Sequence, residues 1–471
     1  MNVSVTDCPP ASESCVTSQP FVVDLDGTLL KSDLLFECAM AFVRSKPLQC
    51  LKPLAWLTHG KAYLKEQLAQ STDIDVATLP YDPDVLWMIE AQRNSGRKIV
   101  LATASHYSLG VRIAEHLQVF DEVLGTTLER NLSGTHKRDV LVTSYGEGGF
   151  DYVGNSFDDL PIWRSARQAF VVNPLPGVAL AIRHLGNVVQ VIRSDATTLR
   201  SWSKALRIHQ WMKNALIFVP LLAAHQLAHP LQLWHGVLAF VFFGLCASGV
   251  YVLNDLLDLA DDRKHPTKRH RPFASGSLSI KSGLMVFPLL LLVSFTGAWI
   301  WLPRSFVAVL ACYYVLTLVY SLVLKRLMAL DVITLALLYT LRIIAGGAAF
   351  GLELTGWMLA FSMFMFLSLA LVKRYAELLV ALHSGITGKT GGRDYFPADL
   401  AMLSSLGAAS GYLTVMVLAL YIHDSATTAL YAHPRWIWLA CPVLLLWITR
   451  IWLLTHRGRM NDDPVVFALR D

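Results

Sequence analysis

The chain has 471 residues, about three times the ~150 residues typical of a single domain. Hydrophobic residues make up 54% and charged residues 16%, and the mean hydropathy is +0.45, which excludes a disordered, collagen-like or disulfide-stapled protein and argues against a wholly soluble multidomain enzyme. The formal net charge of +5 is small for this length, so we expect no nucleic-acid partner.

Cysteine usage indicates a reducing compartment. The cysteines are odd in number, scattered, and without a CxxC pair, which argues against both a zinc site and a disulfide framework. We expect reduced thiols on the cytoplasmic side at Cys8, Cys15, Cys38, Cys50, Cys246, Cys312 and Cys441.

The apolar residues are concentrated in the second part of the chain. Residues 1–20 form a polar tail without a basic segment before an apolar core, so we expect no signal peptide. Residues 21–193 are typical of a soluble domain and 194–204 (SDATTLRSWSK) of a linker. Residues 205–471 contain long apolar stretches and are predicted to form a membrane domain.

About 20 apolar residues are needed to cross the hydrocarbon core of a bilayer. The first candidate span is short and carries His209, Lys213 and Asn214 near its start. Eight candidate spans follow one another: 208–224, 232–254, 282–302, 305–324, 329–350, 355–373, 402–422 and 436–455.

Basic residues gather in alternate loops, which predicts the orientation of these spans. One set of loops carries Arg263, Lys264, Lys268, Arg269, Arg271, Lys281, Lys325, Arg326, Lys373, Arg374, Lys389, Arg393, Arg457, Arg459 and Arg470, and the other set only Arg304 and Arg435. This positive-inside asymmetry predicts a multi-pass protein of the cell inner (plasma) membrane, with the soluble domain and the active sites on the cytoplasmic side.

The soluble domain shows polar residues at the ends of predicted strands. The apolar segment FVV is followed by Asp24, Asp26 and Gly27, and KIVLATAS (98–105) contains Thr103. Strands alternate with helix-like segments, which predicts a doubly wound parallel α/β sheet with its site at the strand ends. Downstream lie Lys137 in GTHK and Asn155, Asp158 and Asp159 in FDYVGNSFDDLPIW. The stretch between Asp33 and about Leu86 is helix-like and predicts a small helical cap.

These residue types suit phosphoryl transfer. Asp24 can attack phosphorus as a carboxylate nucleophile, and Asp26 can act beside it as general acid and base. Thr103 and Lys137 can hold phosphate oxygens, and Asp159 can complete a Mg²⁺ site of oxygen ligands.

In this order the motifs resemble the haloacid-dehalogenase (HAD) phosphatase superfamily, over roughly residues 20–180. The resemblance implies aspartyl-phosphate chemistry on Asp24, proton transfer by Asp26, and Mg²⁺ held by Asp24, Asp26, Asn155 and Asp159. The sequence departs from the superfamily at Asn155, which stands where an acidic residue usually follows the motif glycine. An amide oxygen can still bind Mg²⁺ or its water, but it adds no negative charge.

The membrane domain has an acidic motif of its own at the end of the second predicted span, in YVLNDLLDLADDRKHPTKRHRPFASGSLS (251–279). On a continuous helix, Asp255, Asp258 and Asp262 would share one face, with Asn254 beside them. Carboxylates at membrane depth indicate a functional site, and hard oxygen ligands favour Mg²⁺ bridging to a substrate phosphate.

This NDxxDxxxD segment and the RPxxSG after it resemble the UbiA-type membrane prenyltransferases, over about residues 204–456. The resemblance implies an all-α bundle of about eight or nine spans and a Mg²⁺-diphosphate bound by the first acidic motif. These enzymes carry a second acidic motif after the sixth span, where this chain has LVKRYAEL with Lys373, Arg374 and Glu377. The segments QWMKN, YSLVLKRLMALD, TLRIIAGG and KRYAEL resemble one branch of the superfamily, the polyprenyl-phosphate phosphoribosyltransferases.

That branch joins a polyprenyl phosphate to phosphoribosyl pyrophosphate (PRPP) and releases diphosphate. By this resemblance Asp255, Asp258 and Asp262 are the expected catalytic residues and Mg²⁺ ligands. Charge on the departing diphosphate would be stabilised by metal and fixed cations. The expected substrate-binding residues of this half are Lys213, Asn214, Asn254, Lys268, Arg271, Lys325, Arg342, Lys373 and Arg374.

The combined expectation is a bifunctional membrane enzyme. Its C-terminal half would transfer 5-phosphoribose from PRPP to a polyprenyl phosphate, and its N-terminal half would remove the 5-phosphate, a step in building cell-wall polymers. The alternative is a UbiA-type prenyltransferase that uses a prenyl diphosphate and a small acceptor, with a silent or regulatory HAD-like domain. A transporter is disfavoured because the polar residues gather at one membrane face. A homo-oligomer stays open, as does a ninth span beyond DDPVVFALRD.

Overall fold

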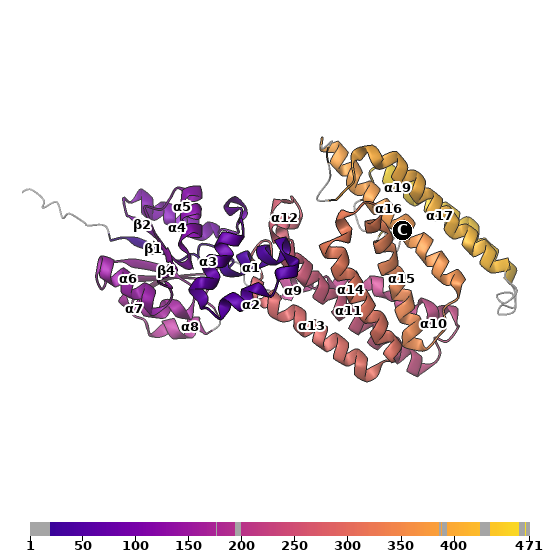
Figure 1. Ribbon diagram of the computed structural model, residues 1–471, viewed down its shortest axis with the longest axis horizontal. Helices are drawn as coiled ribbons and strands as arrows, with labels where there is room; N and C mark the ends of the chain where they lie inside the picture. The colour runs from indigo at the N-terminus through magenta and orange to yellow at the C-terminus, as the bar shows by residue number, and fades with distance from the viewer. Residues whose placement is uncertain are drawn as a thin grey trace, which may run out of the picture. The chain divides into compact units, whose positions relative to one another are not determined.

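The computed structural model describes residues 19–175, 177–193, 199–385, 388, 393–423, 434–460 and 467. The chain divides into two compact units (Figure 1). The first combines Met1–Ser201 with Leu257–Lys281, and the second combines Trp202–Leu256 with Ser282–Asp471. The predicted tail up to residue 18, residues 194–198 of the predicted linker, Cys8, Cys15, Lys389, Arg470 and the site of a ninth span lie outside the described residues.

The first unit is built on a six-stranded sheet in the order β3-β2-β1-β4-β5-β6. Every neighbouring pair is parallel, and in the centre Val22 pairs with Val100 on one side and with Tyr152 on the other. This confirms the predicted doubly wound parallel sheet. The strands are β1 Phe21–Val23, β2 Ile99–His106, β3 Glu122–Thr126, β4 Asp151–Gly154, β5 Gln168–Val172 and β6 Val188–Ile192.

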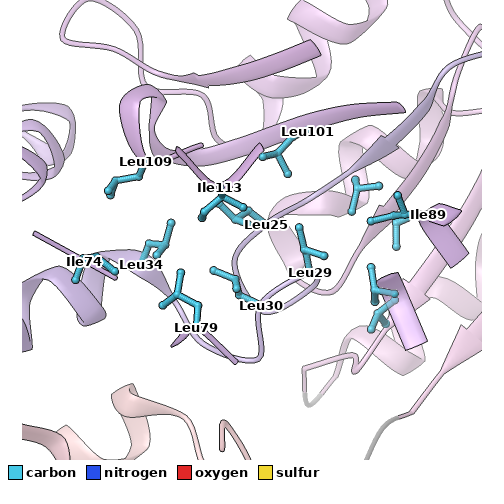
Figure 2. Packing of buried hydrophobic residues seen from close by; sticks show 14 of the residues in the cluster. Leu25, Leu29, Leu30, Leu34, Ile74, Leu79, Ile89, Leu101, Leu109 and Ile113 are labelled. Carbon is cyan, nitrogen blue, oxygen red and sulfur yellow. The ribbon is translucent and has the colours of Figure 1, made fainter. Parts of the chain in front are cut away.

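Alternate side chains of the strands enter two separate cores because successive residues of a strand point to opposite faces. Phe21 and Val23 pack with Leu101 and residues of the helices on one face, and Figure 2 shows part of this cluster. Val22 packs on the other face with residues of α6, α7 and α8. The helices are α1 Leu34–Ser45, α2 Lys52–Leu57, α3 Lys61–Ser71, α4 Pro83–Asn94, α5 Tyr107–Leu117, α6 Thr135–Tyr145, α7 Leu160–Ser165 and α8 Val178–Ala181.

The predicted cap is formed by helices α1, α2 and α3, between β1 and α4. Asp33 caps α1, since its side chain accepts a 2.9 Å hydrogen bond from the Leu35 N–H. A further short helix of this unit, α12 Leu259–Lys264, comes from the segment between the second and third predicted spans. Sequence order alone placed that segment in the membrane domain.

The second unit is a bundle of long apolar helices. Seven helical stretches among the described residues are long and apolar enough to cross a membrane. The first predicted span, 208–224, is wrong as a single helix: it forms a 3₁₀ segment Ile208–Phe218 and the short α10 Val219–Ala223, with Pro220 at the start of α10. The spanning stretches are α11 Pro230–Leu257, α13 Ile280–Trp301, α14 Arg304–Leu322, α15 Leu330–Phe350, α16 Gly356–His383, Pro397–His423 with α17 Leu400–His423, and Trp436–His456 with α19 Ala440–His456.

Small residues allow close approach inside this bundle. A Cβ added at Gly346 of α15 would lie 2.0 Å from the Ile217 carbonyl oxygen, and one at Gly407 of α17 would lie 2.0 Å from the Trp452 ring. Such contacts are typical of helices that pack in membranes, where backbones approach through small residues. Because Gly346 has no side chain, the 3₁₀ segment that carries Lys213 and Asn214 can pack directly against α15.

Candidate active sites

The first site lies at the carboxyl ends of β1, β2 and β4. Asp24 follows β1 and is anchored by its own N–H, which donates to the Val153 carbonyl at 3.0 Å. Gly27 turns the chain with a φ of +76°, and a Cβ there would lie 2.2 Å from Nδ2 of Asn155. Glycine is therefore required here both by the backbone angle and by the close approach of Asn155.

Lys137 binds the predicted nucleophile directly. Its Nζ lies 2.6 Å from Oδ1 of Asp24 and donates to the Tyr152 hydroxyl at 3.1 Å, with both charged groups buried. Burial raises the pKa of Asp24 to about 7; the Lys137 ammonium opposes this rise and the Asp159 carboxylate adds to it. Burial lowers the pKa of Lys137, but Asp24 and Asp159 outweigh burial and raise it above its usual value. The pair thus places a fixed cation where a phosphoryl group would reach Asp24.

Asp26 is oriented by three donors. Its Oδ1 accepts from the Leu34 N–H at 2.8 Å, and its Oδ2 accepts from the hydroxyls of Ser105 at 2.7 Å and Thr103 at 3.4 Å. Burial, with the Asp33 carboxylate next in size, raises the pKa of Asp26 to about 6. A carboxyl group that titrates near neutral pH is suited to proton transfer.

Asp159 holds the loop after β4. Its Oδ2 accepts from the N–H groups of Asn155 and Ser156 at 2.9 and 2.8 Å and from the Ser156 hydroxyl, and its Oδ1 accepts from the Tyr152 hydroxyl at 2.7 Å. These bonds fix Asn155 against Gly27. The predicted role of Asp159 as a metal ligand stays a prediction.

The oxygens of Asp24, Asp26 and Asn155 are the hard donors that Mg²⁺ prefers. Because Gly27 has no Cβ, the Asn155 amide can lie against the loop that carries Asp24 and Asp26. No three His, Cys, Asp or Glu side chains in the described part of the chain form a metal-binding group by themselves. A bound Mg²⁺ would be held by the carboxylates of Asp24 and Asp26 and by the Asn155 amide, with water and substrate oxygens completing its coordination.

Sequence reasoning missed two contributors to this site. Lys65 of α3 donates to the Ala104 carbonyl at 2.6 Å and to Oδ1 of Asn131 at 2.9 Å, so the cap contacts the end of β2 and the loop after β3. Burial lowers the pKa of Lys65, while the Asp26 carboxylate opposes this. Tyr152 links Lys137 with Asp159 from inside β4. An alternating strand residue and a lysine in a helical insert carry no sequence signal for this role.

The acidic motif at the end of α11 is not one continuous helix. Helix α11 ends at Leu257, Asp258 lies outside helical geometry, and α12 begins at Leu259. The predicted shared helical face is therefore wrong, because the helix is interrupted between Asp255 and Asp262. Within the second unit, Asp255 is buried and forms a 2.5 Å ion pair with Arg207.

Within the first unit, α1 binds the segment Leu257–Lys281, which we call the acidic loop. Arg263 forms two hydrogen bonds with the Glu37 carboxylate, at 2.5 and 3.1 Å, and both side chains are buried. Arg44 of α1 contacts Asp261 and donates to the Leu257 carbonyl at 3.3 Å. Other contacts are Lys264 with Asp75 at 2.9 Å and Asp262 with Arg271 at 2.7 Å.

In the second unit the predicted cations fall into two groups. Arg374 of α16 is buried and binds Asp331 at 2.5 Å, Glu377, and the Tyr320 hydroxyl. Asp331 also accepts from the Tyr395 hydroxyl at 2.6 Å, and Glu377 also binds Arg393. The charge of Arg374 is therefore balanced by carboxylates.

Arg342 of α15 has a different environment. Its guanidinium donates to Oδ1 of Asn214 at 3.1 Å, to the Leu338 carbonyl at 2.6 Å and to the Tyr313 hydroxyl at 3.3 Å, all neutral groups. The Nδ2 of Asn214 is buried and has no hydrogen-bond partner. Lys213 lies 5.6 Å from the centre of the Tyr339 ring, which also faces Arg342 at 5.4 Å. Lys213, Asn214 and Arg342 thus form a buried cationic cluster, ~16 Å along α15 from Asp331.

The remaining predicted substrate-binding residues are spread over several elements. Asn254 is on α11, with its Oδ1 buried and without a hydrogen-bond partner. Lys268 is exposed on the 3₁₀ segment Lys268–His270, Lys325 lies on the 3₁₀ segment Leu324–Arg326, and Lys373 is half-buried on α16. The substrate-binding roles of these residues stay predictions.

The fold joins a bundle of membrane-length helices to a phosphatase-like α/β domain. The family model of the UbiA prenyltransferase family matches residues 215–470, and that of haloacid dehalogenase-like hydrolases matches residues 21–142. The chain belongs to the UbiA prenyltransferase family and carries a HAD hydrolase-like domain. Both resemblances inferred from the sequence are confirmed.

Two curated relatives and one solved structure illustrate the similarity. An uncharacterized protein, y4nM of Sinorhizobium fredii, is 38% identical over 458 residues, covering 96% of this chain and 87% of the relative. Decaprenyl-phosphate phosphoribosyltransferase of Mycobacterium tuberculosis is 34% identical over 222 residues, covering 46% of this chain and 73% of that enzyme. The structure of a UbiA homolog from Archaeoglobus fulgidus, bound to DMAPP and Mg2+, shares 15% identity with a TM-score of 0.45, covering 57% of this chain and 93% of that one.

Proposed function

We propose that the C-terminal half transfers 5-phosphoribose from PRPP to a polyprenyl phosphate at the cytoplasmic side of the inner membrane. A phosphate oxygen of the lipid would attack C1 of PRPP, the bond from C1 to the diphosphate oxygen would break, and diphosphate would leave. The similarity to decaprenyl-phosphate phosphoribosyltransferase supports this choice of substrates.

The observation that carries this proposal is the environment of Arg342. A buried guanidinium with only neutral partners retains its positive charge for a ligand, and the Asn214 amide beside it has an unused donor. A phosphate is the group that satisfies both, because it accepts several charge-assisted hydrogen bonds. Arg342, Asn214 and Lys213 would hold a substrate phosphate.

The rival function, prenyl transfer from a prenyl diphosphate, needs a second acidic site near α16. The carboxylates of that region are already bound to cations: Asp331 binds Arg374, and Glu377 binds Arg374 and Arg393. A metal ion there would have to displace a buried arginine from its carboxylates. The local charges therefore favour a substrate phosphate that arrives without a second metal.

We further propose that the N-terminal half removes the 5-phosphate from the lipid product. Asp24 would attack phosphorus and form an aspartyl phosphate, while Asp26 gives its proton to the departing ribose oxygen. Water would then cleave the aspartyl phosphate as Asp26 takes up the water proton, releasing inorganic phosphate. Mg²⁺, when bound, would neutralise phosphate charge, and Lys137 would hold a phosphoryl oxygen beside Asp24.

Both steps are tested in membranes containing the full chain, with radiolabelled PRPP, Mg²⁺ and a polyprenyl phosphate. Label in the lipid extract supports the transferase, and mass analysis of that lipid reports the phosphatase. Asp255→Asn should lower lipid labelling by about a hundredfold or more, as loss of a charge-stabilising group does. Label that stays wholly aqueous would refute the transferase, and incorporation from a prenyl diphosphate would establish the rival.

A further inference from the structure

The cap of the first unit exposes a row of leucines. Leu48 is 100% exposed, Leu51 71%, Leu54 64% and Leu57 45%. Large apolar side chains that are exposed singly are ordinary, but a contiguous group marks an interaction surface. We call these four residues the leucine face.

These leucines follow one another at three-residue intervals along the segment. Leu48 lies in the 3₁₀ segment Pro47–Gln49, Leu51 is the N-cap residue of α2, and Leu54 and Leu57 lie in α2. Residues three apart are neighbours on the surface of such helices, so the leucines follow one another along the segment. Trp56 of α2 points the other way and packs edge-on against the buried Phe42 ring, with ring centres 5.1 Å apart. The segment is therefore pinned to the core by its inner side, and its outer side is apolar.

Lysines flank the leucine face along the chain. Lys46, Lys52 and Lys61 are exposed, and residues 45–61 (SKPLQCLKPLAWLTHGK) include no Asp or Glu. Leucines flanked by lysines are typical of segments that lie in the interface of an anionic membrane, with apolar side chains among the acyl chains and lysines among the headgroups.

We propose that the leucine face inserts into the interfacial layer of an anionic lipid membrane and holds the phosphatase cap there. The helices of the second unit keep this chain at a membrane, so a lipid surface is always available to it. Insertion itself stands apart from the proposed reactions, and only the substrate preference drawn below rests on the proposed phosphatase.

Membrane insertion of the cap would have a consequence for substrate choice. The neighbouring helix α3 carries Lys65, which reaches the Ala104 carbonyl beside the Asp26 site. The same small cap thus contacts the phosphatase site and carries the leucine face. A phosphate ester attached to a membrane lipid would be favoured over a soluble one.

The natural Cys50, exposed between Leu48 and Leu51, provides a probe position. The full chain is reconstituted in vesicles containing phosphatidylglycerol and labelled with an environment-sensitive maleimide dye. The signal from the other cysteines is measured in the Cys50→Ser variant and subtracted. Quenching of the Cys50 signal by lipids brominated in their acyl chains is expected, together with protection from aqueous iodide. Replacing the four leucines by Gln should abolish the lipid quenching, whereas Trp87→Gln, which removes an isolated 72%-exposed side chain of α4, should leave it unchanged.

Two outcomes would overturn the proposal. Quenching by iodide but not by brominated lipid would show that the segment is in water. Protection from both quenchers would show that protein covers it, either a partner or another part of this chain.

The lysine contribution is tested separately. Pure phosphatidylcholine vesicles or high salt should reduce lipid quenching, because headgroup attraction is screened over about 10 Å at 0.1 M salt. Equal quenching in neutral and anionic vesicles would overturn the anionic preference. As a functional readout, the four-Gln variant should hydrolyse a soluble phosphate ester at the wild-type rate and a lipid-linked one about tenfold more slowly. Failure of both the wild type and the variant on either ester would count against the proposed phosphatase and leave the quenching result intact.

Discussion

The ion pair between Glu37 and Arg263 should support the transferase even though Glu37 belongs to the phosphatase cap. Arg263 lies in the acidic loop with Asp258 and Asp262, and its guanidinium is held by Glu37 and by the Ala274 carbonyl at 3.0 Å. Replacing Glu37 by Ala leaves the Arg263 charge buried without its carboxylate. The acidic loop should then lose its strongest described attachment to α1.

The magnitude follows from burial. The side chains of Glu37 and Arg263 are only 4% and 7% exposed, so solvent screens the pair little. Removing one partner of a buried pair costs about 3–5 kcal/mol. For a unit of this size each kcal/mol shifts the unfolding temperature by about 2–4 °C, so Glu37→Ala should lower it by roughly 6–20 °C. The pair Lys98–Glu122, with side chains 47% and 34% exposed, is a matched control, and Glu122→Ala should cost less than about 1 kcal/mol.

The measurements are thermal unfolding in detergent and lipid labelling from PRPP in membranes. We expect Glu37→Ala to lower lipid labelling about tenfold or more, and Glu122→Ala to leave it unchanged. Adding Arg263→Met to Glu37→Ala should restore much of the lost stability, because no unpaired charge remains. Wild-type stability and labelling in Glu37→Ala would refute the idea that α1 supports the acidic loop.

Three further outcomes are expected. Asp24→Asn should stop the reaction at the 5-phosphorylated lipid without slowing its formation; identical lipid products from wild type and variant, by mass analysis, would show that Asp24 is not a working nucleophile on this substrate. Gly27→Ala should lower the unfolding temperature of the first unit and abolish phosphate release, because its Cβ would strike Asn155 at 2.2 Å; a wild-type melting curve would contradict this. Arg342→Ala should raise the apparent KM for a phosphorylated substrate in a stable protein, whereas Arg374→Ala should mainly destabilise the second unit by leaving Asp331 unpaired; a stable Arg374→Ala with a raised KM would reverse this assignment.

Much of the fold was predictable because its signals are local. An apolar strand ending in Asp24 and Asp26 and apolar stretches of bilayer length each determine their own structure, and the parallel sheet and the long helices are confirmed. The failures are also physical. The stretch 208–224 has the composition of a span, but the buried Lys213 and Asn214 belong to a 3₁₀ segment packed on α15, and Pro220 starts the separate short helix α10.

Partners distant in the sequence could not be predicted. Glu37 and Arg263 are 226 residues apart, and nothing local to either distinguishes a buried pair from a solvated surface charge. Lys65 has the same difficulty, since its contact with the Ala104 carbonyl depends on how the cap closes over β2. The break at Asp258 has no sequence signal either, because the carboxylate spacing also fits an unbroken helix.

The two groups of cations, which the sequence does not distinguish, differ in the charges of their partners. Around Arg374 the charges cancel, since two arginines meet the two carboxylates of Asp331 and Glu377. A phosphate brought there would have to compete with carboxylates that already hold the guanidinium in a buried place, so little favourable energy remains for it. Around Arg342 a phosphate would replace only weak neutral partners and would gain the donor of Asn214. We therefore propose that Arg374 stabilises the fold through its ion pairs and that Arg342, with Lys213 and Asn214, binds the substrate phosphate.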